Sequence, residues 1–153
     1  LEELERVISV LPWIATIDKF QHWIYTHPSH TNEERTAEWV KIMDEFSVGL
    51  TDWSGLEDYR AVFWQKQLHL YEVPFYYIEY GIAQLGAIAM WRQYRNNKEQ
   101  ALDNYMRALS QGYTKTLPQL YEIAGIQFNF SPAYVSELGQ FVKERLVEMG
   151  VNE

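Results

Sequence analysis

Apolar residues recur at three- and four-residue spacing along almost the whole chain, and this pattern constrains the fold more than any other feature. Such spacing places apolar side chains on one face of an α-helix. No stretch shows the sustained two-residue alternation that a half-buried strand requires. We therefore expect an all-α fold in which the 153 residues form a single helical domain.

Capping residues and helix breakers divide this pattern into about seven helices. Thr31 with Glu34 forms a capping box, and Ser131 precedes a proline at a first helical position. Pro12 lies inside the first helix and is expected to kink it, whereas Pro74 ends one helix and begins the next. The expected helices span residues 4–24, 31–49, 56–70, 74–95, 97–112, 116–125 and 131–150.

Two glycines interrupt the expected helix that follows Pro74. Gly81 and Gly86 lower its helix propensity, which is unusual without a structural reason. We interpret both as positions where the backbone of a neighbouring segment comes close.

Charge and cysteine content exclude several classes of function. Thirteen basic and twenty-one acidic side chains give a formal charge of -8, which disfavours nucleic acid or an anionic membrane as a partner. The longest charge-free apolar stretches, residues 7–17 and 80–91, are too short to cross a bilayer. The chain has no cysteine, so it has neither a disulfide nor a thiolate metal site, and we expect a cytoplasmic protein.

The N-terminus has none of the features of a signal peptide. The chain starts at Leu1 without an initiator methionine, a basic region or a cleavage site. We interpret it as a segment of a longer protein.

The four histidines do not form a zinc-binding pattern. His22 and His27 are five residues apart, which places them on different faces of a helix, and no local pattern supplies three ligands. His22 follows Asp18 by one helical turn, so we interpret this pair as structural. We expect no metal ligands within the chain.

Residues 68–81 gather one imidazole and four phenols around Pro74. On a helix, Tyr77 and Tyr80 share a face, and His69 lies on the preceding turn. Neutral phenols and an imidazole can donate hydrogen bonds to an oxyanion in a dry cleft. An aromatic core stripe with internally bonded hydroxyls explains the same spacing, and spacing alone leaves both interpretations open.

Several separated motifs resemble one family. They are residues 11–25 (LPWIATIDKFQHWIY), residues 69–80, residues 81–87 (GIAQLGA), residues 108–113, Leu117-Pro118, residues 124–126 and Phe128. In this order they are similar to the C-terminal part of the oligoendopeptidase F group of M3 zinc metallopeptidases. The resemblance covers almost the whole chain.

The resemblance implies a mostly helical hydrolase whose deep channel admits short peptides. In that family a His-Glu-x-x-His helix and a downstream Glu hold Zn²⁺, and the Glu of the motif acts as general base on the metal-bound water. The motif is absent from this sequence, which implies that the zinc ligands lie upstream of it. By the same resemblance His69, Tyr77 and Tyr80 are catalytic, and Tyr71 and Tyr76 bind substrate.

We therefore expect the C-terminal part of a zinc metalloprotease, inactive alone, that self-associates or pairs with the missing N-terminal half of the enzyme. The alternative is a stand-alone helical module that binds a peptide or a partner helix without catalysis. A longer reading frame with His-Glu-x-x-His upstream would favour the peptidase, and a start codon just before Leu1 would favour the module.

Overall fold

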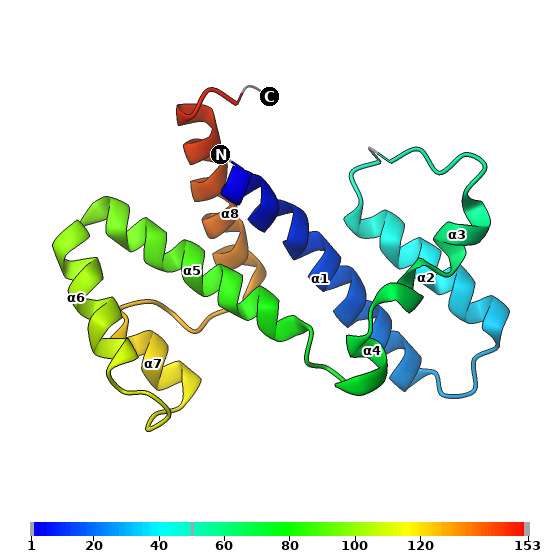
Figure 1. The fold of residues 1–153 in the computed structure, drawn as a ribbon, viewed down its shortest axis with the longest axis horizontal. Coiled ribbons are helices and arrows are strands. Elements are labelled where there is room, and N and C mark those ends of the chain that lie inside the picture. The colour runs from blue at the N-terminus through cyan, green and yellow to red at the C-terminus, as the bar shows by residue number, and fades with distance from the viewer. Residues whose placement is uncertain (1, 50, 152–153) are drawn as a thin grey trace. The chain divides into compact units, whose positions relative to one another are not determined.

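A computed structural model describes residues 2–49 and 51–151, and within these residues all regular structure is helical. The helices are α1 (Glu2–Thr26), α2 (Asn32–Phe46), α3 (Glu57–Ala61), the 3₁₀ helix η1 (Phe63–Lys66), α4 (His69–Glu72), α5 (Ile78–Asn96), α6 (Lys98–Leu109), α7 (Leu117–Ile123) and α8 (Pro132–Glu148), in the order shown in Figure 1. The expected all-α class is confirmed. The described residues contain eight α-helices rather than seven.

The predicted helix starts agree with the observed caps. Thr31 Oγ1 accepts from the amide of Glu34 at 3.2 Å, and Glu34 Oε2 accepts from the amide of Thr31 at 2.8 Å. Asn97 caps α6 by accepting from the amide of Gln100, and Ser131 caps α8 ahead of Pro132. These local signals were sufficient because a capping side chain bonds within three residues of itself.

The third expected helix is wrong as a single element. In its place the chain forms α3, η1 and α4 in succession. The backbone tightens at η1, where Gln65 N–H donates to the carbonyl of Val62 at 2.9 Å and Trp64 turns into the core. The Arg60 carbonyl accepts a hydrogen bond from Trp39 Nε1 at 2.8 Å. Local sequence patterns do not predict such a tertiary contact.

The predicted start of the next helix at Pro74 is also wrong, because α5 begins at Ile78. Phe75 adopts φ +59°, a left-handed conformation that cannot continue a right-handed helix. Pro74 therefore lies in a bend between α4 and α5, and Tyr77 immediately precedes α5.

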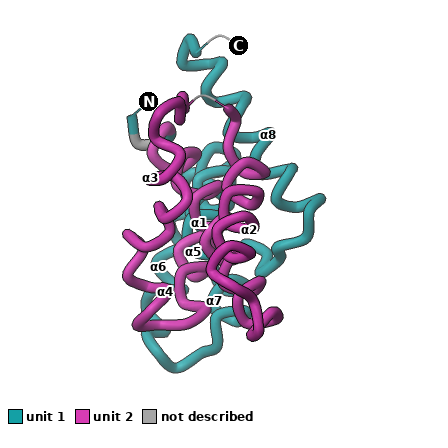
Figure 2. Tube along the Cα trace, turned by 90° about the vertical axis from the view of Figure 1, so that its right-hand side faces the viewer, with its two compact units in different colours: residues 1–4, 82–153 teal, residues 5–81 magenta. Residues whose placement is uncertain are grey.

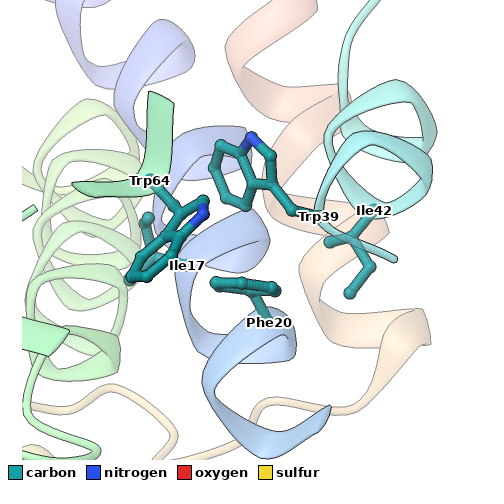
Figure 3. Packing of buried hydrophobic residues seen from close by; sticks show 5 residues of the cluster. All are labelled: Ile17, Phe20, Trp39, Ile42 and Trp64. Atoms are coloured by element: carbon teal, nitrogen blue, oxygen red, sulfur yellow. The ribbon is translucent and has the colours of Figure 1, made fainter. Parts of the chain in front are cut away.

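The chain divides into two compact units, one of residues 5–81 and the other of residues 1–4 and 82–153 (Figure 2). In the first unit, five side chains from α1, α2 and η1 point toward one another as a buried cluster (Figure 3). They are Ile17, Phe20, Trp39, Ile42 and Trp64. The ring of Phe20 lies 5.1 Å from that of Trp39 and 5.5 Å from that of Trp64, so aromatic packing joins α1 to both neighbours.

In the second unit, α6 packs on α7, and α8 supplies buried side chains that include Leu138 and Phe141. Phe141 meets Trp91 of α5 with ring centroids 5.0 Å apart. At Gly86 of α5 the close neighbour is the side chain of Tyr121, and at Gly81 it is that of Ile14. The expected approach of a neighbouring backbone is therefore replaced by contact with a side chain at both glycines.

Among the described residues, none of the helices combines the length and the apolar character that crossing a membrane would require.

Candidate functional site

The bend between α4 and α5 determines how the residues around Pro74 are arranged. Gln21 of α1 is 2% exposed, and its Oε1 accepts a hydrogen bond from the amide of Phe75 at 2.9 Å. The ring of Phe75 packs 4.8 Å from that of His22 and 4.9 Å from that of Tyr25. Helix α1 therefore stabilises the left-handed conformation that separates α4 from α5.

This bend brings His69, Tyr77 and Tyr80 together. His69 Nε2 lies 3.3 Å from the hydroxyl of Tyr80. The His69 ring lies 4.9 Å from that of Tyr77, and the rings of Tyr77 and Tyr80 are 5.3 Å apart. The three residues singled out in the sequence thus form one cluster, which we call the His69 cluster.

Tyr76 also belongs beside this cluster, whereas Tyr71 does not. The Tyr76 ring stacks on that of His69 with centroids 6.1 Å apart and planes 8° from parallel. The Tyr71 ring stacks instead on Trp64, with centroids 6.0 Å apart. Tyr71 is on α4 two residues after His69, so its side chain leaves the helix in a different direction.

The His69 cluster is open to solvent on its phenolic side. Tyr76 and Tyr80 are each 42% exposed, and Tyr77 is half-buried. Burial raises the pKa of Tyr77, opposed by a hydrogen bond from Trp13. Repulsion from the charge of Tyr80 and a hydrogen bond to it raise the pKa of Tyr76. Both shifts keep the phenols in the neutral form, which retains a proton to donate.

The sequence analysis did not identify two residues that support the His69 cluster, Gln67 and Trp13. Gln67 Nε2 lies 2.6 Å from His69 Nδ1, and Trp13 Nε1 donates to Gln67 Oε1 at 3.1 Å. Trp13 is on α1, 54 residues before Gln67, so no local spacing could relate them. The position of Gln67 two residues before a candidate histidine was the one available signal.

Asp18 and His22 contact each other one helical turn apart. His22 Nδ1 contacts the Asp18 backbone carbonyl at 2.9 Å and its carboxylate at 3.4 Å. Burial raises the pKa of Asp18, and His22 partly opposes this shift. Within residues 2–49 and 51–151, no three histidine or carboxylate side chains are grouped so that they could hold a metal ion.

The geometry of the His69 cluster suits hydrogen-bond donation to a bound group. An imidazole and three phenols converge on one side of the bend, and two of the hydroxyl-bearing rings are exposed. Neutral donors of this kind can bind a carbonyl oxygen and stabilise negative charge that develops on it.

Comparisons with known proteins found similar peptidases. The chain matches two solved structures: an X-ray structure assigned as oligoendopeptidase F (29% identity, TM-score 0.79) and PZ peptidase A with an inhibitor (30% identity, TM-score 0.80). The matches cover 95% and 96% of this chain and 26% of each of those chains. This chain thus spans about a quarter of the length of the peptidases it matches. A search of the curated proteins found no match.

The sequence also matches the family model described as peptidase family M3, over residues 1–140. This match covers most of the chain and includes every residue of the His69 cluster. The chain therefore belongs to peptidase family M3.

Proposed function

We propose that this chain is the C-terminal part of a zinc-dependent oligoendopeptidase that hydrolyses short peptides. Its role there is to contact the substrate through His69, Tyr77 and Tyr80, with Tyr76 as a further substrate contact; Tyr71, which stacks on Trp64, is left out of this proposal. Membership of the M3 family and the peptidase identity of both structural matches support this proposal.

The observation that carries the proposal is the contact between His69 Nε2 and the exposed hydroxyl of Tyr80. When a peptide carbonyl is attacked, its oxygen gains negative charge. A preplaced donor stabilises that charge more strongly than it binds the uncharged ground state. Such a donor contributes about 3 to 4 kcal/mol to the transition state in a site that excludes water.

Zinc would come from outside this chain. The sequence lacks the His-Glu-x-x-His motif, and the described residues contain no grouped metal ligands. We accordingly assign substrate contacts, and no metal ligand, to this chain. We expect the chain alone to cleave no peptide.

Complementation tests the proposal directly. The 153-residue chain is mixed with the separately produced upstream part of the same enzyme and Zn²⁺, and cleavage of a quenched fluorescent peptide is followed. We expect cleavage only in the mixture, together with a complex on size-exclusion chromatography. A mixture that neither binds nor cleaves would overturn the proposal.

A second measurement addresses the role of one hydroxyl. In the reconstituted peptidase, Tyr77→Phe keeps the ring and removes the hydroxyl, so kcat should fall by about 10²-fold with the helical circular dichroism unchanged. Unchanged turnover would overturn the role proposed for Tyr77. Tight binding of peptides that are never cleaved, even by the mixture, would instead favour a helical interaction module.

A further inference from the structure

A chain of hydrogen bonds links α1 to the exposed hydroxyl of the His69 cluster. Trp13 Nε1 lies 3.1 Å from Gln67 Oε1, and Gln67 Nε2 lies 2.6 Å from His69 Nδ1. His69 Nε2 in turn lies 3.3 Å from the Tyr80 hydroxyl. Trp13 Nε1 has a fixed role as a donor, and the roles of the other atoms in this network follow from it.

The Trp13 indole determines which atom donates in each hydrogen bond of this network. Trp13 Nε1 can only donate a hydrogen bond, so the atom of Gln67 that faces it must be the carbonyl oxygen. The amide nitrogen of Gln67 then faces His69, and an amide –NH₂ group can also only donate. His69 Nδ1 must therefore be the acceptor and carry no proton.

The same reasoning determines the donor in the hydrogen bond between His69 and Tyr80. A neutral imidazole carries one proton, which must lie on Nε2 when Nδ1 has none. Nε2–H then donates to the oxygen of Tyr80. Tyr76 is also hydrogen-bonded to this hydroxyl, and because that bond raises the pKa of Tyr76, Tyr76 is its donor. The Tyr80 oxygen thus accepts from both His69 and Tyr76, and the hydroxyl proton of Tyr80 points toward another acceptor.

We propose that Gln67, oriented by Trp13, is a positioning residue that holds His69 in the Nε2–H tautomer and so keeps the Tyr80 proton available to a substrate carbonyl oxygen. The last step rests on the proposed peptidase function, whereas the tautomer of His69 does not. Gln67 itself touches no substrate in this arrangement and acts through His69.

Several other titratable groups surround the network. Tyr76, Tyr77 and Tyr80 place their rings around the imidazole. Lys66 Nζ lies 4.4 Å from the ring centroid of Trp13, and Glu79 acts on Tyr76. His69 Nδ1 is hydrogen-bonded to the Gln67 amide, so substitution of Gln67 is the direct way to change the tautomer.

The tautomer is measured by ¹⁵N NMR of the imidazole nitrogens in the 153-residue chain, with the His69 signals identified by their loss in His69→Gln. We expect an unprotonated Nδ1 in the neutral ring of the unsubstituted chain. In Gln67→Glu the carboxylate still accepts from Trp13 but can only accept from His69, so Nδ1 should become protonated. The matched control Gln65→Glu adds the same charge at an exposed position of η1 and should leave the tautomer unchanged.

Two NMR results would overturn the proposal. One is a protonated Nδ1 in the neutral ring of the unsubstituted chain, and the other is a Gln67→Glu spectrum with Nδ1 still unprotonated. Gln67→Glu preserves the size of the side chain, and the first result needs no variant, so a folding defect cannot hide the answer.

The reconstituted peptidase tests the consequence for Tyr80. In Gln67→Glu, a neutral His69 ring carries its proton on Nδ1, so Nε2 accepts the Tyr80 proton instead of donating to the Tyr80 oxygen. We expect kcat to fall by about 10²-fold with little change in KM, and Gln65→Glu to retain the kcat and KM of the unsubstituted enzyme.

The two parts of the proposal fail separately. An unaltered kcat in Gln67→Glu, combined with a moved proton in the NMR spectrum, would overturn the catalytic consequence of the tautomer. Absence of cleavage by the unsubstituted mixture would count against the peptidase function and would leave the NMR result in place.

Discussion

Two tyrosines with the same chemistry occupy opposite settings in this protein. Tyr121 of α7 donates its hydroxyl proton to the carbonyl of Ile82 at 2.9 Å and lies against Gly86. Tyr80 of α5 contacts His69 with its hydroxyl and is 42% exposed. The hydroxyl of Tyr121 is therefore committed to holding α7 on α5, whereas that of Tyr80 remains open to a ligand.

This difference indicates which tyrosine hydroxyl serves stability and which is available for function. A buried phenol must find an internal partner, because an unpaired polar group away from water is costly. An exposed phenol has no such requirement, so its contact with an imidazole is not explained by the needs of packing. We therefore expect the loss of each hydroxyl to affect a different measurement.

The largest effect should follow removal of the open hydroxyl. In the reconstituted peptidase, Tyr80→Phe should lower kcat by about 10²-fold, because a donor to the transition state is lost. The free energy of unfolding of the chain should change by no more than about 0.5 kcal/mol, as is usual for exposed sites. If Tyr80→Phe lowered the free energy of unfolding in urea but left turnover unchanged, the Tyr80 hydroxyl would serve stability rather than function.

The next effect should come from filling the space against which Tyr121 packs. A Cβ at Gly86 would lie 2.5 Å from the Tyr121 hydroxyl oxygen and 3.0 Å from Cζ, so Gly86→Ala should reduce the free energy of unfolding by about 1 to 3 kcal/mol. Urea unfolding followed by circular dichroism measures this change.

Gly139→Ala is the matched control for that substitution. A Cβ at Gly139 of α8 would meet nothing within 4 Å, so this change should raise the free energy of unfolding by about 0.5 to 1 kcal/mol through helix propensity. Equal effects at the two glycines would show that contact with Tyr121 does not matter.

A smaller effect is expected from removal of the committed hydroxyl. Tyr121→Phe loses one hydrogen bond to the Ile82 carbonyl, which should lower the free energy of unfolding by about 1 kcal/mol. The kcat of the reconstituted peptidase should not change. Combined with Gly86→Ala, the two losses should sum to less than their separate values, because the phenylalanine removes the atom nearest to the new Cβ.

The smallest effect should be a change in the pH dependence of stability. Burial, followed by the charge of Tyr134, raises the pKa of Tyr121. The folded state therefore keeps this proton at a pH where the unfolded chain has lost it. The corresponding stability is complete below about pH 10, the ordinary value for tyrosine, and is lost as the pH rises through the folded pKa.

Alkaline unfolding curves measure that loss. In Tyr121→Phe the fall in the free energy of unfolding above about pH 10 should be shallower than in the unsubstituted chain, because one titrating phenol is gone. The half-buried Tyr77 also has a pKa raised mainly by burial and should retain part of the slope. An identical slope in both proteins would mean that Tyr121 titrates alike in the folded and unfolded states.

Local patterns were sufficient for most of the helices. The capping box at Thr31, the cap at Asn97 and the Ser131-Pro132 pair each placed a helix start correctly. They succeeded because the bonds that stabilise a helix start join residues three apart in the sequence. The resemblance to M3 peptidases was confirmed for a related reason, since its motifs are short segments in a constant order.

The region from Leu56 to Ile78 could not be predicted in the same way. Its helix breaks depend on the Trp39 indole, which bonds the Arg60 carbonyl, and on Gln21, which bonds the amide of Phe75. Both partners are more than twenty residues distant in sequence. Spacing placed Tyr77 inside a helix, whereas the left-handed Phe75 delays that helix until Ile78.

The sequence by itself determined the helical class, most helix starts and the family, and it named a histidine and tyrosines as candidates for the site. Only the tertiary structure decided which phenols meet His69, that Tyr71 turns away to Trp64, and that Gln67 and Trp13 complete the network. The physical reason is the distance along the sequence over which each interaction acts. Helix propensity and capping act over one turn, whereas the orientation of His69 depends on an indole that the fold brings from 54 residues upstream of Gln67.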